Sequence, residues 1–382
     1  MHVTARRFTL RAVASFIGAL AALLLLEGVL RLLPVHESLH KLPVNDKHPI
    51  MRFRPNRQFT FSTGWNFSLV NEVRVNDHGF VSDFPYESDA GGPLLAVIGD
   101  SYVEAAMVRF SDTCAGSLAR ALAPAVRVYA FGVNASALSQ YAAYAEYVRE
   151  TFRPDGLVVV VTDNDFDESL LNDDSLPGYH YFAETDGRLV LQRKDFAPGL
   201  LRELARKSAL ARYIALNVRG ATGGGRLTPM PDGRKLLLAG TPVATDPERM
   251  SGSKRVVDTF LRILPGMAGL EPERIAFVVD GLRSHLYQDE TLAIAEGTYF
   301  DLMRRYFMGK ARGAAYEVLD MQPAFVRHYQ AHGQRFDWPH DYHWNALAHS
   351  LCADAVARSR LLSLTVGDAG AARERDTPTT GA

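Results

Sequence analysis

Residues of the types that act together on an acyl group are found in several short segments far apart in the sequence. Ser101 offers a hydroxyl, His343 an imidazole, and Asp341, just before that histidine, a carboxylate. A serine oxygen becomes a nucleophile when an imidazole accepts its proton, and a carboxylate holds that imidazole in the required tautomer. Gly132 and Asn164 could add the backbone and side-chain amide donors that stabilise an oxyanion. These residue types predict attack by a serine on an acyl carbonyl.

Apolar runs that alternate with helical patterns must position these residues. The runs are typical of buried strands and lie at 94–99, 126–131, 156–161, 274–280 and 316–320. Helical stretches lie between and after them, at 113–122, 138–151, 256–264, 291–308 and 345–358. Alternation of strands and helices gives βαβ units and a parallel sheet, so the sequence predicts an α/β fold.

The candidate residues follow the ends of predicted strands. Ser101 follows the first strand, Gly132 the second and Asn164 the third, and His343 stands just before the last helix. Because ligands of open parallel sheets bind beyond the carboxyl ends of the strands, we expect these residues to meet at one rim. Other interpretations remain open. Ser101 could cap a helix, Gly132 could serve only a turn, and Asn164 could bond a loop backbone. The G-x-S-x-G elbow of α/β-hydrolases is absent, because Val103 replaces its second glycine.

The segments, in this order, resemble the blocks of the SGNH hydrolases, also called the GDSL esterase/lipase superfamily. The matching residues are Gly99-Asp100-Ser101, then Gly132, Asn164-Asp165, and Asp341 with His343. The resemblance covers roughly residues 91–360, and VNDHGF at 75–80 is similar to a lead-in of membrane-anchored bacterial members. It implies a three-layer α/β/α, flavodoxin-like fold with a five-stranded parallel sheet. It also implies a catalytic triad of Ser101, His343 and Asp341, and an oxyanion hole made by Ser101, Gly132 and Asn164, with no cofactor.

The sequence departs from the family pattern at two points. Thr162 stands where the third block usually has glycine, and the last block is Asp-x-His where Asp-x-x-His is common. A literal Asp-x-x-His does occur at Asp337 and His340. We favour Asp341 and His343 because His343 leads directly into the closing helix.

The same region could be interpreted as a metal site. His340, Asp341, His343 and His349 include ligands that zinc or iron accepts, but no further ligand cluster accompanies them, so we expect no metal. The acidic run 163–168 could imitate a calcium loop. It lacks the glycine and the terminal glutamate of such loops, so we interpret it as a solvated loop.

An apolar segment at the N-terminus predicts a membrane anchor. Residues 12–33 are almost free of charge and would span about 33 Å as a helix, enough to cross a bilayer. Arg6, Arg7 and Arg11 precede the segment, so we expect residues 1–11 to stay in the cytoplasm. A cleaved signal peptide and a buried core helix are the alternatives. The anchor places a single-pass protein in the inner membrane, with its main domain in the periplasm.

The remaining sequence suggests how the domains are organised. Residues 34–90 are rich in proline and are expected to pack on the main domain as extended segments. The hydrolase-like domain is expected over 91–363, with an insertion at 165–273 that contains a hairpin turning at Asp186-Gly187 and a helix at 200–218. Residues 364–382 are expected to be disordered. The net charge of −1 argues against a nucleic-acid partner.

The sequence contains two cysteines, Cys114 and Cys352. They fall in the first and last helices of the predicted domain, which cover the same face of a flavodoxin-like sheet. In an oxidising compartment the pair could form a disulfide, and two separate buried thiols are the alternative.

These patterns favour a serine-dependent acyl-ester hydrolase that acts on an ester or an acylated glycan. An O-acetyltransferase of envelope polysaccharide shares the first half-reaction, and a non-catalytic envelope scaffold or glycan-binding module is a third interpretation. The aromatic residues Tyr179, Tyr181, Trp338 and Trp344 are expected to shape the substrate site. Nothing in the sequence assigns a protein partner.

Overall fold

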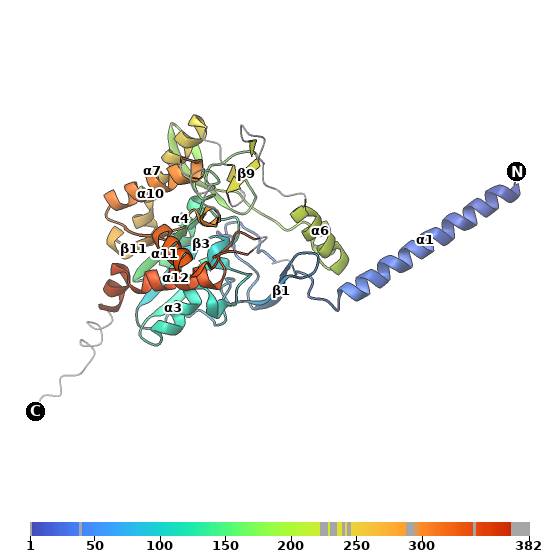
Figure 1. Ribbon diagram of the computed structural model, residues 1–382, viewed down its shortest axis with the longest axis horizontal. Coiled ribbons are helices and arrows are strands. Elements are labelled where there is room, and N and C mark those ends of the chain that lie inside the picture. The colour runs from blue at the N-terminus through green and yellow to red at the C-terminus, as the bar shows by residue number, and fades with distance from the viewer. Residues whose placement is uncertain are drawn as a thin grey trace, which may run out of the picture. The chain divides into compact units, whose positions relative to one another are not determined.

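A computed structural model describes residues 2–37, 40–221, 228–229, 235–238, 241–242, 246–287, 295, 297–338 and 341–367 (Figure 1). The chain forms two compact units. Unit 1 comprises residues 1–39, 59–72 and 198–224, and unit 2 comprises 40–58, 73–197 and 225–382. The candidate catalytic residues all belong to unit 2.

A parallel five-stranded sheet forms the centre of unit 2. Its strands are β3 (Leu94–Gly99), β4 (Arg127–Gly132), β5 (Gly156–Val161), β11 (Ile275–Val279) and β12 (Glu317–Asp320). They lie in the order β12-β11-β5-β3-β4, and every neighbouring pair is parallel. β3, β5 and β11 are buried along their whole length, which explains why they consist almost entirely of apolar residues. This is the predicted flavodoxin-like order. The first of these strands along the chain, β3, lies between β5 and β4, and β4 forms the edge of the sheet.

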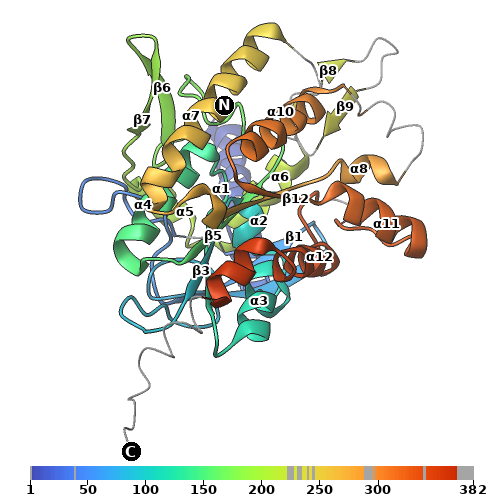
Figure 2. The same ribbon diagram turned by 90° about the vertical axis from the view of Figure 1, so that its left-hand side faces the viewer.

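Helices cover both faces of the sheet, so the predicted three-layer α/β/α architecture is confirmed. α3 (Cys114–Leu122) packs against α12 (Ala346–Ala357), and α7 (Pro247–Ala268) packs against both α4 (Leu138–Phe152) and α10 (Tyr299–Gly313). Figure 2 shows the two groups on opposite sides of the strands. α7 starts earlier than the predicted helix at 256–264, because Asp246 caps its N-terminus and Pro247 occupies its first turn. Much of the predicted start of α10, at 291–298, lies outside the described residues.

The remaining elements of unit 2 are shorter. The predicted hairpin is confirmed as β6 (His180–Thr185) and β7 (Arg188–Arg193), with Asp186 and Gly187 at positive φ in its turn. The other helices and small strands are α2 (Ser101–Glu104), β8 (Thr228–Pro229), β9 (Lys235–Leu238), β10 (Thr241–Pro242), α8 (Arg283–Leu286) and α11 (Gln322–His332). Residues 360–367 are helical, and the rest of the predicted disordered tail, 368–382, lies outside the described residues.

Unit 1 contains the N-terminal helix and segments from two later parts of the chain. α1 (His2–Leu30) includes an apolar stretch, Leu10–Leu30, that is long enough to cross a membrane. α5 (Leu200–Ala205), α6 (Ala209–Ala221) and most of the hairpin β1 (Arg57–Thr63) and β2 (Leu69–Val75) belong to the same unit. Segment 34–90, which we expected on the main domain, is thus divided between the two units.

Candidate active site

The first loop at the rim of the sheet carries Ser101. β3 ends at Gly99, and Ser101 is the first residue of the short helix α2. Asp100 caps this helix, since its carboxylate accepts a hydrogen bond of 2.9 Å from the backbone N–H of Tyr102. The capping role that Ser101 could have played is therefore filled by its neighbour. The hydroxyl of Ser101 is instead directed to His343, with 2.8 Å between Oγ and Nε2.

His343 lies between the serine and an acidic group. Its Nδ1 contacts Oδ1 of Asp341, and the same carboxylate oxygen accepts a 3.0 Å hydrogen bond from the backbone N–H of His343. These two contacts with Asp341 fix both the imidazole ring of His343 and the backbone of its loop. Asn345 then caps α12 by accepting from the N–H groups of Leu347 and Ala348. The structure thus brings together Ser101, His343 and Asp341, from segments more than two hundred residues apart.

The surroundings of this histidine change its basicity. Burial lowers the pKa of His343, but the hydrogen bond and negative charge of Asp341, helped by Asp100, outweigh it and hold the pKa above its ordinary value. Burial raises the pKa of Asp341. The hydrogen bonds and charge of His343 outweigh burial and keep this pKa below its ordinary value. The pair therefore favours a protonated imidazole beside an ionised carboxylate, which is the state that follows proton transfer from a serine.

Gly132 ends β4 directly beside the serine loop. A Cβ atom at this position would lie 2.4 Å from the backbone nitrogen of Glu104 and 2.7 Å from the carbonyl carbon of Val103. Since both are backbone atoms of α2, only glycine allows this approach. The loop that follows is fixed by Glu104, whose carboxylate accepts a 2.6 Å hydrogen bond from the N–H of Asn134. Burial raises the pKa of Glu104 to about 7.

Asn164 stands at the end of β5, on the same rim. Its side-chain nitrogen donates to Glu168 at 2.8 Å, and its side-chain oxygen accepts from the hydroxyl of Thr162 at 3.0 Å. An amide carries two N–H donors, so the bond to Glu168 fixes the orientation of the group and uses one of them. The hydroxyl of Thr162 also reaches Asp100 at 3.3 Å. Thr162, which replaces the glycine of the SGNH pattern that the sequence resembles, thus links the loop of Asn164 to the loop of Ser101.

The acidic run after β5 is only in part the solvated loop that we expected, since Glu168 is exposed and Asp167 is half-buried. Asp163 and Asp165 are buried, and Asp165 accepts hydrogen bonds of 2.7 Å from the hydroxyl of Tyr141 and from the N–H of Thr162. Burial raises the pKa of Asp163 to about 8. The prediction failed for Asp165 because its carboxylate turns inward to bond Thr162, just after β5, and Tyr141, in the first turn of α4, which a count of charges does not reveal.

A buried ion pair beneath the site was not predicted. Arg283, just after β11, donates through Nε and Nη2 to the carboxylate of Asp280. Asp280 also accepts a 3.0 Å hydrogen bond from the indole N–H of Trp344. Trp344 is therefore a core residue, and the expectation that it shapes the substrate site is wrong. The only signal in the sequence was a charged pair directly after a strand.

Two further aromatic residues of the predicted substrate site are buried as well. Tyr179 and Tyr181 lie at 2% and 7% exposure. The hydroxyl of Tyr179 donates to the carbonyl of Asn134 at 2.6 Å, so this tyrosine supports the loop after Gly132. Trp338 is partly buried, and its backbone pairs with that of Asp341.

The alternative base and the metal interpretation concern the loop around residue 340. His340 lies outside the described residues. Asp337 accepts hydrogen bonds from Arg335 and lies 3.7 Å from Arg283. His349 is buried under Trp344, and its Nδ1 accepts from the N–H of Cys114. Across the described part of the chain, no three His, Cys, Asp or Glu side chains gather as a metal-binding group.

Cys114 and Cys352 are neighbours, as the predicted packing of the first and last helices requires. Both are buried free thiols, and their sulfur atoms are 2.8 Å apart. A disulfide has an S–S length of about 2.05 Å. The proximity is confirmed, and the covalent bridge remains a prediction.

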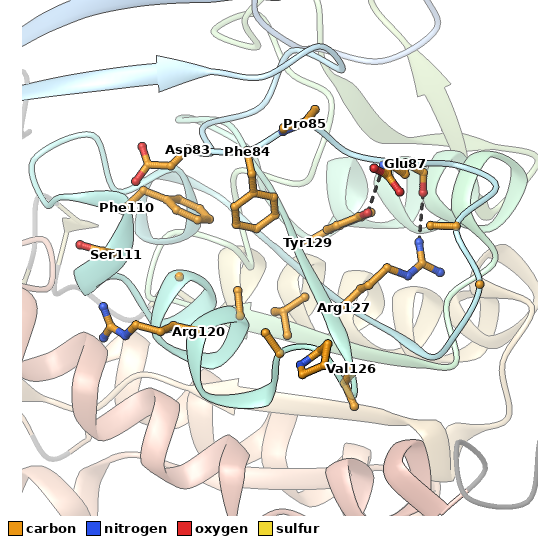
Figure 3. Close-up of a pocket in the computed structure, with 17 residues that line it drawn as sticks. Asp83, Phe84, Pro85, Glu87, Phe110, Ser111, Arg120, Val126, Arg127 and Tyr129 are labelled. Atoms are coloured by element: carbon orange, nitrogen blue, oxygen red, sulfur yellow. Dashed lines mark hydrogen bonds between the residues drawn. The ribbon is translucent and has the colours of Figure 1, made fainter. Parts of the chain in front are cut away.

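A pocket of about 740 Å³ lies away from the triad, beside the first residues of β4. Figure 3 shows Phe84, Phe110 and Tyr129 lining it, with Arg127 at one end. Ser101, which follows the end of β3, and Gly132, which is the last residue of β4, lie at the opposite end of the sheet. The two regions are therefore distinct, and this pocket does not belong to the candidate active site.

Comparisons with known proteins found similarity only among solved structures. No protein-family model and no curated protein matches the chain. An alpha/beta hydrolase from the metagenome of Lake Arreo, Spain, has a TM-score of 0.37 and 15% identity, covering 72% of this chain and 96% of that one. A lipolytic G-D-S-L family member from Veillonella parvula has a TM-score of 0.35 and 9% identity, with coverage of 70% and 98%. A mutant of an acetylxylan esterase from Geobacillus stearothermophilus has a TM-score of 0.36 and 14% identity, with coverage of 74% and 97%. Similarity at these low values assigns no activity to the chain.

Proposed function

We propose that the chain is a serine-dependent hydrolase of carboxylic esters. The observation that carries the proposal is the chain of contacts from Ser101 Oγ to His343 Nε2, and from His343 Nδ1 to Asp341. A hydroxyl, an imidazole and a carboxylate aligned in this way are the groups of nucleophilic acyl transfer. The raised pKa of His343 suits a base that must hold a proton between two steps.

The proposed reaction has two half-reactions. Ser101 Oγ attacks the acyl carbonyl while His343 Nε2 accepts its proton, and the carbonyl oxygen becomes an oxyanion. The tetrahedral intermediate breaks its bond to the alcohol, which leaves with the proton from His343. Water then attacks the acyl-serine, gives its proton to His343, and releases the carboxylic acid as the proton returns to Ser101.

Backbone and side-chain amides at the rim are proposed to stabilise the oxyanion. The candidates are the N–H groups of Ser101 and Gly132 and the amide of Asn164. The close approach of Gly132 to α2 and the bond from Asn164 to Glu168 support fixed positions for these donors. Donors that are already oriented cost no reorganisation when the charge develops.

The experiment is hydrolysis of an activated acetyl ester by the purified chain, followed as acid and alcohol release. Wild-type protein should release both in equal amounts, and Ser101→Ala should lower the rate to the background. Ser101→Ala should fold normally, since Asp100 and not Ser101 caps α2. Acetyl groups recovered on an added glycan instead of as acetate would assign a transferase. A wild type without either product would favour the non-catalytic scaffold.

We also propose that α1 is a retained membrane anchor with unit 2 on the extracytoplasmic side. The apolar stretch Leu10–Leu30 is only 6% buried, and arginines precede it. The last turns of α1 are tied to the fold, since the carboxylate of Glu27 accepts hydrogen bonds from Ser208 Oγ and from the N–H groups of Ala209 and Leu210. A signal peptide that is cleaved would lose these contacts. Resistance to alkaline carbonate extraction, with unit 2 open to protease from the outside only, tests this topology.

A further inference from the structure

Unit 1 has its own small core, in which the end of α1 is held by later parts of the chain. Leu30, Val35 and Ala209 are buried together, and Phe67, Leu210 and Tyr213 pack against them. These residues come from α1, from the segment after it, from the tip of the β1–β2 hairpin and from α6. The end of the apolar helix is therefore fixed against α6 and the hairpin tip.

Polar contacts reinforce this arrangement. Glu27 supplies its carboxylate to the N-terminus of α6, where orphan N–H groups need acceptors. Arg31, the first residue after α1, pairs with Glu27 at 2.7 Å. The hairpin tip is held by Tyr213 of α6, whose hydroxyl donates to the carbonyl of Trp65 at 2.5 Å and whose ring meets the Trp65 indole edge to face.

Although it has a core, unit 1 leaves many large apolar side chains in contact with solvent. Leu32 is 87% exposed and Trp65 is 55% exposed. The other exposed large apolar residues of this unit outside α1 are Leu33, Val70, Leu200, Leu204 and Ile214. Among the described residues, unit 1 outside α1 carries as many of these as the much larger unit 2. Where exposed apolar side chains gather on one surface, they mark a region that another phase or partner covers.

The continuity of this surface with α1 identifies what covers it. Leu32 and Leu33 follow the apolar stretch that ends at Leu30, with only Arg31 between them. Trp65 is connected to α1 through α6. Its carbonyl accepts a hydrogen bond from Tyr213 of α6, and the N-terminus of α6 is bonded to Glu27 of α1. If α1 crosses a bilayer, these groups lie where the hydrocarbon ends and the headgroups begin. Tryptophan and leucine on a partly polar surface are favoured in that region, since the indole offers both an apolar body and an N–H donor.

We propose that unit 1 forms a collar on the membrane surface around the outer end of α1, and that Trp65 inserts among the lipid headgroups. The collar consists of the β1–β2 tip, the segment after α1, α5 and α6, with Leu32, Trp65, Leu204 and Ile214 as its lipid-contacting residues. This inference rests on the anchor role proposed for α1. It is independent of the chemistry proposed for Ser101.

Fluorescence quenching of the full-length protein in lipid vesicles tests the collar. The chain contains three tryptophans, Trp65, Trp338 and Trp344, so Trp65→Phe isolates the contribution of the collar. Phosphatidylcholine brominated close to the headgroup should quench wild type more strongly than phosphatidylcholine brominated deep in the chain. Trp65→Phe should lose this extra quenching, and the matched variant Trp338→Phe should keep it.

Flotation of the same vesicles after a carbonate wash separates the collar proposal from the anchor proposal. Protein that floats but shows equal quenching in wild type and Trp65→Phe overturns the collar and leaves the anchor intact. Protein that fails to float overturns both. Trp65 that is shielded from aqueous acrylamide but not quenched by brominated lipid overturns the collar in favour of a second copy or a protein partner. Loss of ester hydrolysis in vesicles that pass the quenching test bears on Ser101 alone.

Discussion

Arg283 donates a 2.8 Å hydrogen bond to the hydroxyl of Tyr102, the residue directly after Ser101. The same nitrogen, Nη2, donates to the carbonyl of Tyr342 at 2.9 Å, directly before His343. Tyr102 completes a triangle by donating to that carbonyl at 3.1 Å. One buried guanidinium thus joins the segment of the proposed nucleophile to the segment of the proposed base, and Asp280 neutralises its charge.

Replacement of this guanidinium should misplace the two segments without removing either reacting group. We expect Arg283→Lys to lower kcat roughly 10–100-fold with little change in KM, because an ammonium keeps the charge but cannot reach all the acceptors at once. Steady-state kinetics on an activated ester measures both constants. Arg312→Lys, at an exposed position near the end of α10, is the matched control. Equal kcat values in the two variants would refute the positioning role.

The basicity of His343 gives a prediction for the pH profile. A general base acts in its neutral form, and the raised pKa delays that form to higher pH, so kcat/KM should rise through a midpoint above the ordinary histidine value. In Asp341→Asn the raising contributions of the carboxylate are lost and burial remains, so the midpoint should move to lower pH. We also expect kcat to fall by about 10³–10⁴-fold. An unchanged midpoint of the pH profile in Asp341→Asn would show that a group other than His343 causes the rise of kcat/KM.

The close approach at the end of β4 gives a test of the oxyanion donors. Gly132→Ala would place Cβ against the backbone of α2, so the strand end must shift. Loss of one oxyanion donor costs about 10²–10³ in rate, and we expect a decrease of that size. Gly91→Ala is the control, since a Cβ there meets nothing within 4 Å. If both variants kept wild-type rates, Gly132 would have only a structural part.

The two neighbouring thiols predict a redox-dependent bridge. Oxidised glutathione should accept two electrons and two protons from the thiols of Cys114 and Cys352, which gives two molecules of reduced glutathione and one intramolecular disulfide. Free thiols titrated in denaturant should then disappear, and the free energy of unfolding should rise by about 2–4 kcal/mol. Cys352→Ser should keep one titratable thiol and gain no stability. Two thiols that still titrate after exhaustive oxidation would exclude the bridge.

Much of the fold could be predicted from local pattern. The apolar runs 94–99 and 156–161 are strands of those bounds, because a strand buried on both faces has no polar position to interrupt it. The meeting of Ser101 and His343 could be predicted in two parts. The end of β3 places Ser101 at the rim where the carboxyl ends of parallel strands lie, and the resemblance places His343 just before the closing helix. The hydroxyl of Thr162, the capping role of Asp100 and the bond between Glu104 and Asn134 were not, because the sequence does not show where a polar side chain turns.

The features that the sequence did not predict depend on contacts between distant segments. Asp280 and Arg283 pair with each other over one turn, but their bonds to Tyr102 and Trp344 depend on the final packing of β11 against the loops at the rim. Unit 1 joins α1 to α6 across more than 170 residues, and no periodicity in segment 34–90 indicates that part of it belongs there.

The most direct test of Ser101 as the nucleophile is its covalent capture by a fluorophosphonate, followed by intact-mass and peptide mass spectrometry. We expect one added phosphonyl group per chain, located on Ser101, with labelling absent in Ser101→Ala and strongly slowed in His343→Ala. A wild-type chain that hydrolyses esters but gains no mass, or gains it equally in Ser101→Ala, would contradict the proposed nucleophile.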